Sequence, residues 1–177
     1  MKRVLCLLLC LFSVTAHAGD IDLKGLAVVR IKSKRISDLI MEQAILIQGE
    51  EAHFMGLNDF GAVAFVVRFS GNRLTIDMPS GNHLETSGKK LKNILSLPLS
   101  QNEFLGVIRY ERPRDFREVC EKGTCSWMKQ GKKALSIVFS DFKSLKDFGN
   151  YPYRITLTYK KSIFDLKWQN VTLQSGL

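Results

Sequence analysis

The stretch Glu51–Phe69, EAHFMGLNDFGAVAFVVRF, decides the fold because it holds two β-prone runs joined by a turn. The runs cover 52–57 and 62–69, and the residues Asn-Asp-Phe-Gly at 58–61 connect them. Asn, Asp and Gly form turns because they tolerate a left-handed backbone or bond their own main chain. The pattern predicts a β-hairpin whose tip carries one large aromatic residue, Phe60.

The second run of this hairpin is apolar on both faces. One face carries Val63, Phe65, Val67 and Phe69, and the other carries Ala62, Ala64 and Val66. A strand with one face in water alternates apolar with polar residues, so we expect something to cover each face here. Protein core is one candidate cover, and a bound apolar ligand is the other.

The rest of the chain repeats the two-residue alternation of β-strands, with one interruption. Strands are predicted over 26–32, 36–48, 73–78, 116–120, 126–129, 134–140, 153–159 and 164–168. The interruption, 89–97, has helical spacing and is stopped by Pro98, which lacks an N–H donor. Ser100 and Glu103 then form a capping box, which predicts a second short helix over about 101–108. The expected fold class is α+β, mainly β, with antiparallel strands in series.

The N-terminus has the three parts of a secretory signal peptide. A basic start at Lys2-Arg3 precedes an apolar run at 4–14 and a small-x-small cleavage site at 16–18. We therefore expect a signal peptide over 1–18 and one exported mature domain over 19–177. Lipidation of Cys10 is disfavoured because Leu9 precedes it, where a small residue is needed.

The formal net charge of +9 is spread along the chain rather than gathered into one run. It is compatible with solubility, or with weak attraction to an anionic membrane surface at about 1 kcal/mol per well-placed basic residue. A secretory signal disfavours nucleic acid as a partner.

Only Cys120 and Cys125 remain after the predicted cleavage, separated by Glu-Lys-Gly-Thr. An even pair flanking a turn in an exported protein favours a disulfide across a hairpin. A metal site is the rival interpretation. Two thiolates without a nearby His cannot complete a tetrahedral shell, so no metal is expected.

The chain offers little for catalysis. His53 and His83 survive cleavage, the first inside a predicted strand and the second within Ser-Gly-Asn-His-Leu-Glu, which is typical of a turn. No nucleophile motif or oxyanion hole accompanies them. We expect neither an enzyme nor a cofactor.

The order of these elements resembles the bacterial lipoprotein carrier and receptor family of the LolA and LolB type, and more closely its outer-membrane acceptor, LolB. Residues 58–61 stand where that family has an Asn-Pro-Leu-Gly loop, whose exposed hydrophobic residue engages the membrane. The segment LKNILSLPLSQNEFLGVI at 91–108 is similar to its helical insert. IVFSDFK, PYRITLTY and IFDLKW resemble its closing strands.

Two features depart from the family. Residues 19–24 are too short for its usual N-terminal helix, and the acceptor is normally lipid-anchored, which this chain is not expected to be. The departures leave open whether the protein is a carrier, an acceptor or both.

The resemblance implies an incomplete antiparallel β-barrel with short helices over one mouth and an apolar cavity for acyl chains. A triacylated lipoprotein exposes on the order of 45 methylene groups, each costing about 0.8 kcal/mol to hold in water. The implied location is the periplasm, with the protein soluble or peripherally associated with the outer membrane. The implied function is to shelter these acyl chains and help deliver lipoproteins to the outer membrane. The implied partners are the membrane surface, in transient contact, and a carrier or inner-membrane release complex. The alternative is a periplasmic module that binds or senses fatty acids or other lipids without transferring lipoproteins.

The site residues implied fall into two groups. Phe60 and Leu57 form the membrane-contact loop, with Phe60 either exposed toward a target or tucked back against Leu57. The second group is the candidate cavity lining, and each of its members is also compatible with plain core. It comprises Ile45, Ile47, Val63, Phe65, Val67, Ile137, Phe139, Ile155, Leu157, Leu166 and Trp168.

Overall fold

The computed structural model describes residues 22–34, 36–71, 73–87, 95–113, 115–129, 135–146 and 148–174. The predicted signal peptide, Cys10 and the expected start at Gly19 lie outside these residues, as does most of the helix predicted over 89–97. Among the described segments, we find no helix with both the length and the apolar character needed to cross a membrane.

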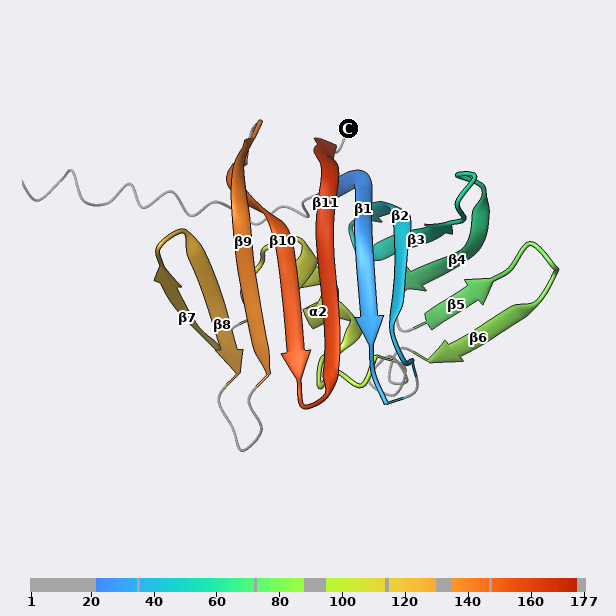
Figure 1. Ribbon diagram of the computed structural model, residues 1–177, viewed down its shortest axis with the longest axis horizontal. Coiled ribbons are helices and arrows are strands. Elements are labelled where there is room, and N and C mark those ends of the chain that lie inside the picture. The colour runs from blue at the N-terminus through green and yellow to red at the C-terminus, as the bar shows by residue number, and fades with distance from the viewer. Residues whose placement is uncertain are drawn as a thin grey trace, which may run out of the picture.

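Eleven antiparallel strands form one sheet (Figure 1). The first six are β1 (Asp22–Lys32), β2 (Leu39–Gln48), β3 (Glu51–Leu57), β4 (Val63–Ser70), β5 (Arg73–Asp77) and β6 (His83–Ser87). The other five are β7 (Phe116–Glu121), β8 (Thr124–Lys129), β9 (Ser136–Leu145), β10 (Gly149–Tyr159) and β11 (Ser162–Gln174). The sheet order is β6-β5-β4-β3-β2-β1-β11-β10-β9-β8-β7, so hydrogen bonds do not close the sheet. The predicted fold class, an open antiparallel barrel, is confirmed.

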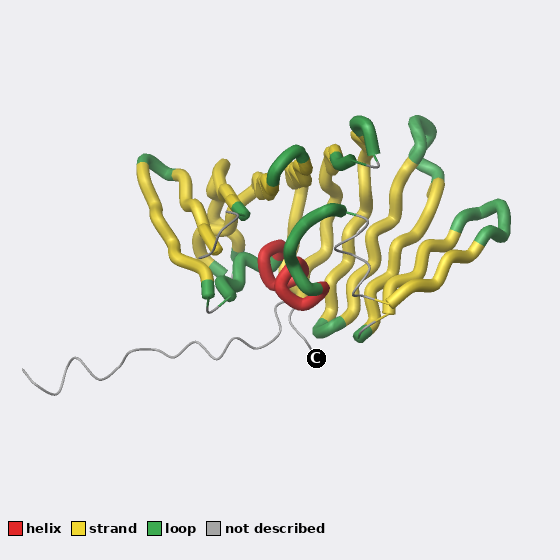
Figure 2. The backbone as a smooth tube through the Cα atoms, turned by 90° about the horizontal axis from the view of Figure 1, so that it is seen from below, coloured by secondary structure: helices red, strands yellow, loops and turns green. Residues whose placement is uncertain are grey.

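Strands β1 and β11 join the two halves of the sheet. Their ladder runs from the pair Asp22–Gln174 to the pair Lys32–Ile163, with a bulge between Leu26 and Ala27. Every other pair of neighbours in this sheet is consecutive in the chain, so this ladder alone brings distant segments together. The sheet curls into a trough, and helix α2 (Gln101–Ile108) lies in its hollow (Figure 2).

Both ends of α2 are set by its sequence. Ser100 Oγ accepts from the Glu103 amide, and the Glu103 carboxylate accepts from the Ser100 amide, which confirms the predicted capping box. At the other end Tyr110 adopts a φ of 63°. The Tyr110 amide bonds the Val107 carbonyl and the Glu111 amide bonds the Gly106 carbonyl, the pattern of a Schellman cap. The helix therefore stops after two turns.

Strands β1, β9, β10 and β11 extend beyond their predicted ranges. Three further differences have a local physical cause. The turn predicted over 80–85 is shorter, and residues 83–87 form strand β6, because the turn at 78–82 is tight enough to return the chain along β5. Residues 36–38 belong to a turn instead of a strand, because the Ser33 amide bonds the Ile36 carbonyl. The outer face of β4 is not covered as expected, since Ala64 is exposed.

A buried hydrogen bond ties α2 to the sheet. The Tyr151 hydroxyl on β10 donates to the Ile108 carbonyl at 2.5 Å, and burial raises the pKa of Tyr151 so that the donor stays protonated. We expect Tyr151→Phe to lower the free energy of unfolding in urea by about 1–3 kcal/mol, because the carbonyl stays buried without its donor.

The matched control is Tyr153→Phe. Tyr153 is half-buried on the same strand, and its hydroxyl makes no hydrogen bond within the described ranges. Equal losses of stability in the two variants would show that the bond to Ile108 does not hold the helix.

Candidate functional site

A cavity of about 270 Å³ lies between α2 and the inner face of strands β1 to β5. Its described lining is apolar except for one glutamine. It consists of Ile31, Ile36, Gln43, Phe54, Phe65, Val67, Phe69, Leu74, Ile76, Met78, Leu95, Phe104 and Phe164. The volume is just below the range of about 300–1,000 Å³ typical of small-molecule pockets.

Aromatic side chains form the inner wall of this cavity. The ring of Phe104, on α2, lies 5.1 Å from Phe164, 6.2 Å from Phe69 and 6.3 Å from Phe54. All four residues are at most 5% exposed. The cluster thus separates the cavity from the packed core beyond it.

The cavity floor has a defined cross-strand order. Gln43 pairs with Gly56, which pairs with Phe65 in the next strand. A Cβ atom at Gly56 would lie 2.6 Å from the Phe65 ring, so glycine allows that ring to lie flat over β3. The next inward-facing cross-strand positions hold Phe54 with Val67 and then Phe69. They continue the cavity floor away from the β3–β4 turn.

At one end the cavity reaches the rim of the sheet. Met78, which follows β5, is 49% exposed, and Ile36 comes from the β1–β2 turn. That turn is held by Arg30, whose guanidinium makes two hydrogen bonds to the Asp38 carboxylate at 2.9 and 2.6 Å. Hydrogen bonding from Arg30 lowers the pKa of Asp38, so the pair stays charged at neutral pH.

The β3–β4 turn presents Phe60 at the same rim. In an antiparallel sheet the turns β1–β2, β3–β4 and β5–β6 all fall on one edge. Phe60 is 94% exposed and is not tucked against Leu57, which is half-buried. The Asn58 side chain accepts from the amides of Phe60 and Ala62 at 3.0 and 2.9 Å, which fixes the shape of the tip. Ile40, on the outer face beside this loop, is 61% exposed.

The predicted lining residues divide between cavity, surface and core. Phe65 and Val67 line the cavity, whereas Val63 is 42% exposed at the rim and is absent from the cavity wall. The others are at most 2% exposed and lie in the core: Ile45, Ile47, Ile137, Phe139, Ile155, Leu157, Leu166 and Trp168. In the C-terminal half these side chains do not line a cavity because Tyr110 packs into the trough. The centroid of its ring lies 5.3 Å from that of Trp127, on which it stacks, and 4.9 Å from that of Phe139.

The sequence contained signals for several lining residues that were not predicted. Phe69 shares a face with Phe65 and Val67, and the alternation along β5 points Leu74 and Ile76 to the same side. Gln43 interrupts the apolar face that continues to Ile45 and Ile47. The contribution of Phe104 could not be predicted, because it depends on where α2 docks.

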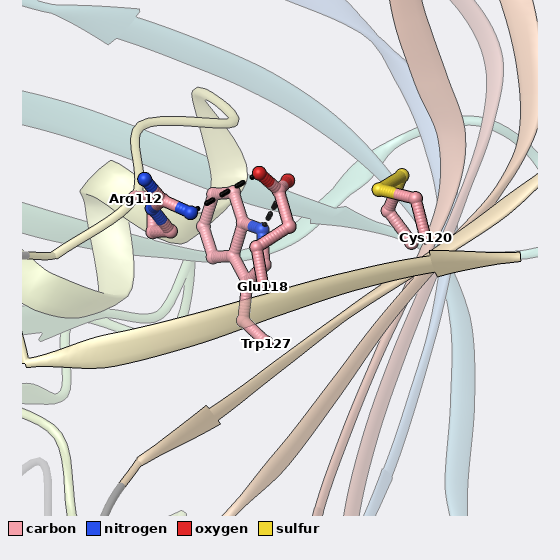
Figure 3. The surroundings of a disulfide bond; sticks show 5 residues. Arg112, Glu118, Cys120 and Trp127 are labelled. Atoms are coloured by element: carbon pink, nitrogen blue, oxygen red, sulfur yellow. Dashed lines mark hydrogen bonds and ion pairs between the residues drawn. A yellow bond between two sulfur atoms is a disulfide. The ribbon is translucent and has the colours of Figure 1, made fainter.

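Cys120 and Cys125 form a disulfide that lies away from this cavity, across the β7–β8 hairpin. Glu118 is close to both sulfurs, but its carboxylate accepts from Trp127 Nε1 at 2.9 Å and from Arg112 at 3.2 Å (Figure 3). Bonded sulfurs are not thiolates, so this group has no ligand set for a metal ion.

Together the curled antiparallel sheet and the helix in its hollow define the class of fold, which solved structures share. A LolA superfamily protein from Nitrosomonas europaea superposes with a TM-score of 0.53 at 10% identity, over 89% of this chain and 88% of that one. A DUF1329 family protein from Desulfovibrio piger superposes with a TM-score of 0.52 at 12% identity, over 88% and 87%. No family model and no curated protein matches the sequence. At these identities the likeness establishes the fold.

The contact between Gly56 and Phe65 generates a test of the cavity. We expect Gly56→Ala to push the Phe65 ring toward the cavity, costing about 1–3 kcal/mol of stability by overpacking. Binding of an apolar fluorophore should weaken as well. Phe65→Leu, combined with Gly56→Ala, should recover most of both losses, as urea unfolding and fluorescence titration would show.

The control is Gly71→Ala, in a turn where a Cβ would contact nothing although the φ of 53° disfavours alanine. It should cost stability without weakening fluorophore binding. A double variant no better than Gly56→Ala alone would contradict the role of the ring.

Proposed function

We propose that this protein is a periplasmic lipoprotein-binding protein that shelters acyl chains in its apolar cavity and helps deliver lipoproteins to the outer membrane. The observation that carries the proposal is the position of one exposed aromatic residue. Phe60 is 94% exposed on the sheet edge that also carries the β1–β2 and β5–β6 turns, and Ile36 and Met78 at those turns line the apolar cavity. A chain leaving the cavity there would meet whatever surface Phe60 touches.

The tip also supports the finer choice of an acceptor of the LolB type over a carrier of the LolA type. Its sequence, Asn-Asp-Phe-Gly at 58–61, keeps the pattern of one large apolar residue before glycine. The Asn58 bonds hold that residue outward before any contact is made. A preformed apolar projection suits brief insertion into a bilayer, because little entropy is lost on contact.

Export by the predicted signal peptide at 1–18 and a mature domain from Gly19 belong to the same proposal. Transient partners would be the membrane surface and a lipoprotein carrier or inner-membrane release complex. No catalytic role is proposed, since the cavity lining carries no nucleophile or titratable group among the described residues.

A second function is favoured by the size of the cavity. About 270 Å³ is below the usual range for ligand pockets and suits part of a single chain better than three chains. A module that binds one fatty acid or other lipid, without transferring lipoproteins, would need no larger cavity. Native mass spectrometry of protein purified gently from its periplasm separates the two functions, because bound lipoprotein supports delivery and bound free fatty acid supports the module.

Phe60→Glu tests delivery separately from acceptance. Inserting one phenylalanine into a bilayer gains roughly 1.5–3 kcal/mol, which a carboxylate forfeits. We expect the variant to take a fluorescent lipopeptide from a donor as well as wild type does, yet to pass it to anionic liposomes at least several-fold more slowly. Stability should shift by no more than about 0.5 kcal/mol, because the site is exposed.

Met128→Glu is the matched control, because it introduces the same charge at a 43% exposed apolar residue. Met128 lies on β8, next to the last strand of the sheet and far in the sheet order from β3 and β4. This variant should transfer at the wild-type rate. Equal rates for Phe60→Glu and wild type would show that Phe60 is not the membrane contact.

A further inference from the structure

One polar side chain faces the apolar cavity. Gln43, on β2, is 4% exposed and lines the wall, where its described neighbours in the lining are aliphatic or aromatic or Met. In the part of the chain that the structure describes, its amide makes no side-chain hydrogen bond. A primary amide carries two donor hydrogens and one acceptor oxygen, and burying them without partners is unfavourable.

Gln43 has room for a partner on its β1 side. Its cross-strand neighbour there is Ala27, which has only a methyl side chain, whereas on β3 the space above Gly56 holds the Phe65 ring. A bulkier side chain at position 27 would cover the amide from the β1 side. The sequence therefore keeps a buried amide accessible from the cavity.

Gln43 also has a defined depth. It lies in the row with Phe65, on the side of the cavity nearest the turns that carry Phe60 and Met78. Beyond that row the floor runs from Phe65 to Phe69, four residues of strand or about 13 Å, and presents apolar side chains. A ligand with a polar group at Gln43 and a hydrocarbon tail over Val67 and Phe69 would match this order.

We propose that the Gln43 amide donates a hydrogen bond to the carbonyl oxygen of an acyl ester, and that the cavity selects neutral esters over free carboxylates. The choice of a neutral group follows from the lining, which has no Lys, Arg or His among the described residues. A buried carboxylate would have no cation to offset its lost hydration, whereas an ester needs only the donor that Gln43 supplies. The inference rests on the proposed function and specifies its ligand class.

The test is displacement of an apolar N-phenylnaphthylamine reporter by three ligands of similar length: methyl decanoate, decanoate and undecane. At about pH 8 decanoate is fully ionised. Wild type should bind methyl decanoate at least about tenfold more tightly than decanoate. Gln43→Leu should reduce the ratio of ester affinity to undecane affinity by about threefold to tenfold, because one hydrogen bond to a buried group is lost. Gln43→Met, nearly the same shape, should give the same change.

Gln101→Leu is the matched control. Gln101 is also 4% exposed and its amide has no hydrogen-bond partner among the described residues, but it lies on α2 outside the cavity lining. Its replacement should leave the ester-to-undecane ratio unchanged.

Each other outcome is decisive. An unchanged ratio in folded Gln43→Leu and Gln43→Met, with binding retained, overturns the role of Gln43 and leaves the proposed function intact. Wild-type binding of decanoate as tight as that of the ester overturns the selectivity and favours the fatty-acid module. Failure of wild type to bind any of the three ligands overturns the proposed function together with this inference.

Discussion

The packing of Phe104 into the trough is the interaction on which the cavity depends. Its ring contacts Phe54 of β3, Phe69 of β4 and Phe164 of β11, so one side chain of α2 bridges both halves of the sheet. Aromatic pairs of this kind contribute about 0.5–1.5 kcal/mol each beyond the area they bury. They hold the helix at a fixed height above the strands, and the space left beside the cluster, toward β4 and β5, is the cavity.

The two halves of the trough are filled differently, although their strands have similar apolar patterns. Under β8 and β9 the loop after the helix inserts Tyr110, whose ring stacks on Trp127 and packs against Phe139. Under β2 to β5 nothing of that size enters among the described residues, and Gly56 lets Phe65 lie back against the sheet. The binding space is therefore decided by the position of the helix and its following loop more than by the strands themselves.

This asymmetry explains how far the sequence could predict the site. Strand alternation, the capping box at Ser100 and Glu103 and the turn that carries Phe60 are local features. They predicted the antiparallel strands, α2 and an aromatic residue at a hairpin tip, whereas the open barrel was implied by the family resemblance. Which residues line the cavity is not decided by the local sequence. Ile155 and Phe65 both follow an alternating pattern, and only the packing of Tyr110 and Phe104 makes one core and the other lining. Strand β6 was missed because its sequence, HLETS, is short and polar and is recruited by pairing with β5.

The ladder between β1 and β11 has a consequence for how the chain reaches this structure. Leu23 pairs with Leu173, so the first strand stays without its second neighbour until nearly all of the described chain has been synthesised. Contacts of such large sequence separation make folding slow, because the entropy of closing the loop is lost before the pairing is gained. The six N-terminal strands can form hairpins early, but their shared core remains open to water until β11 arrives. A chain of this design is expected to stay loosely folded during synthesis and to become compact only when its last strand is available.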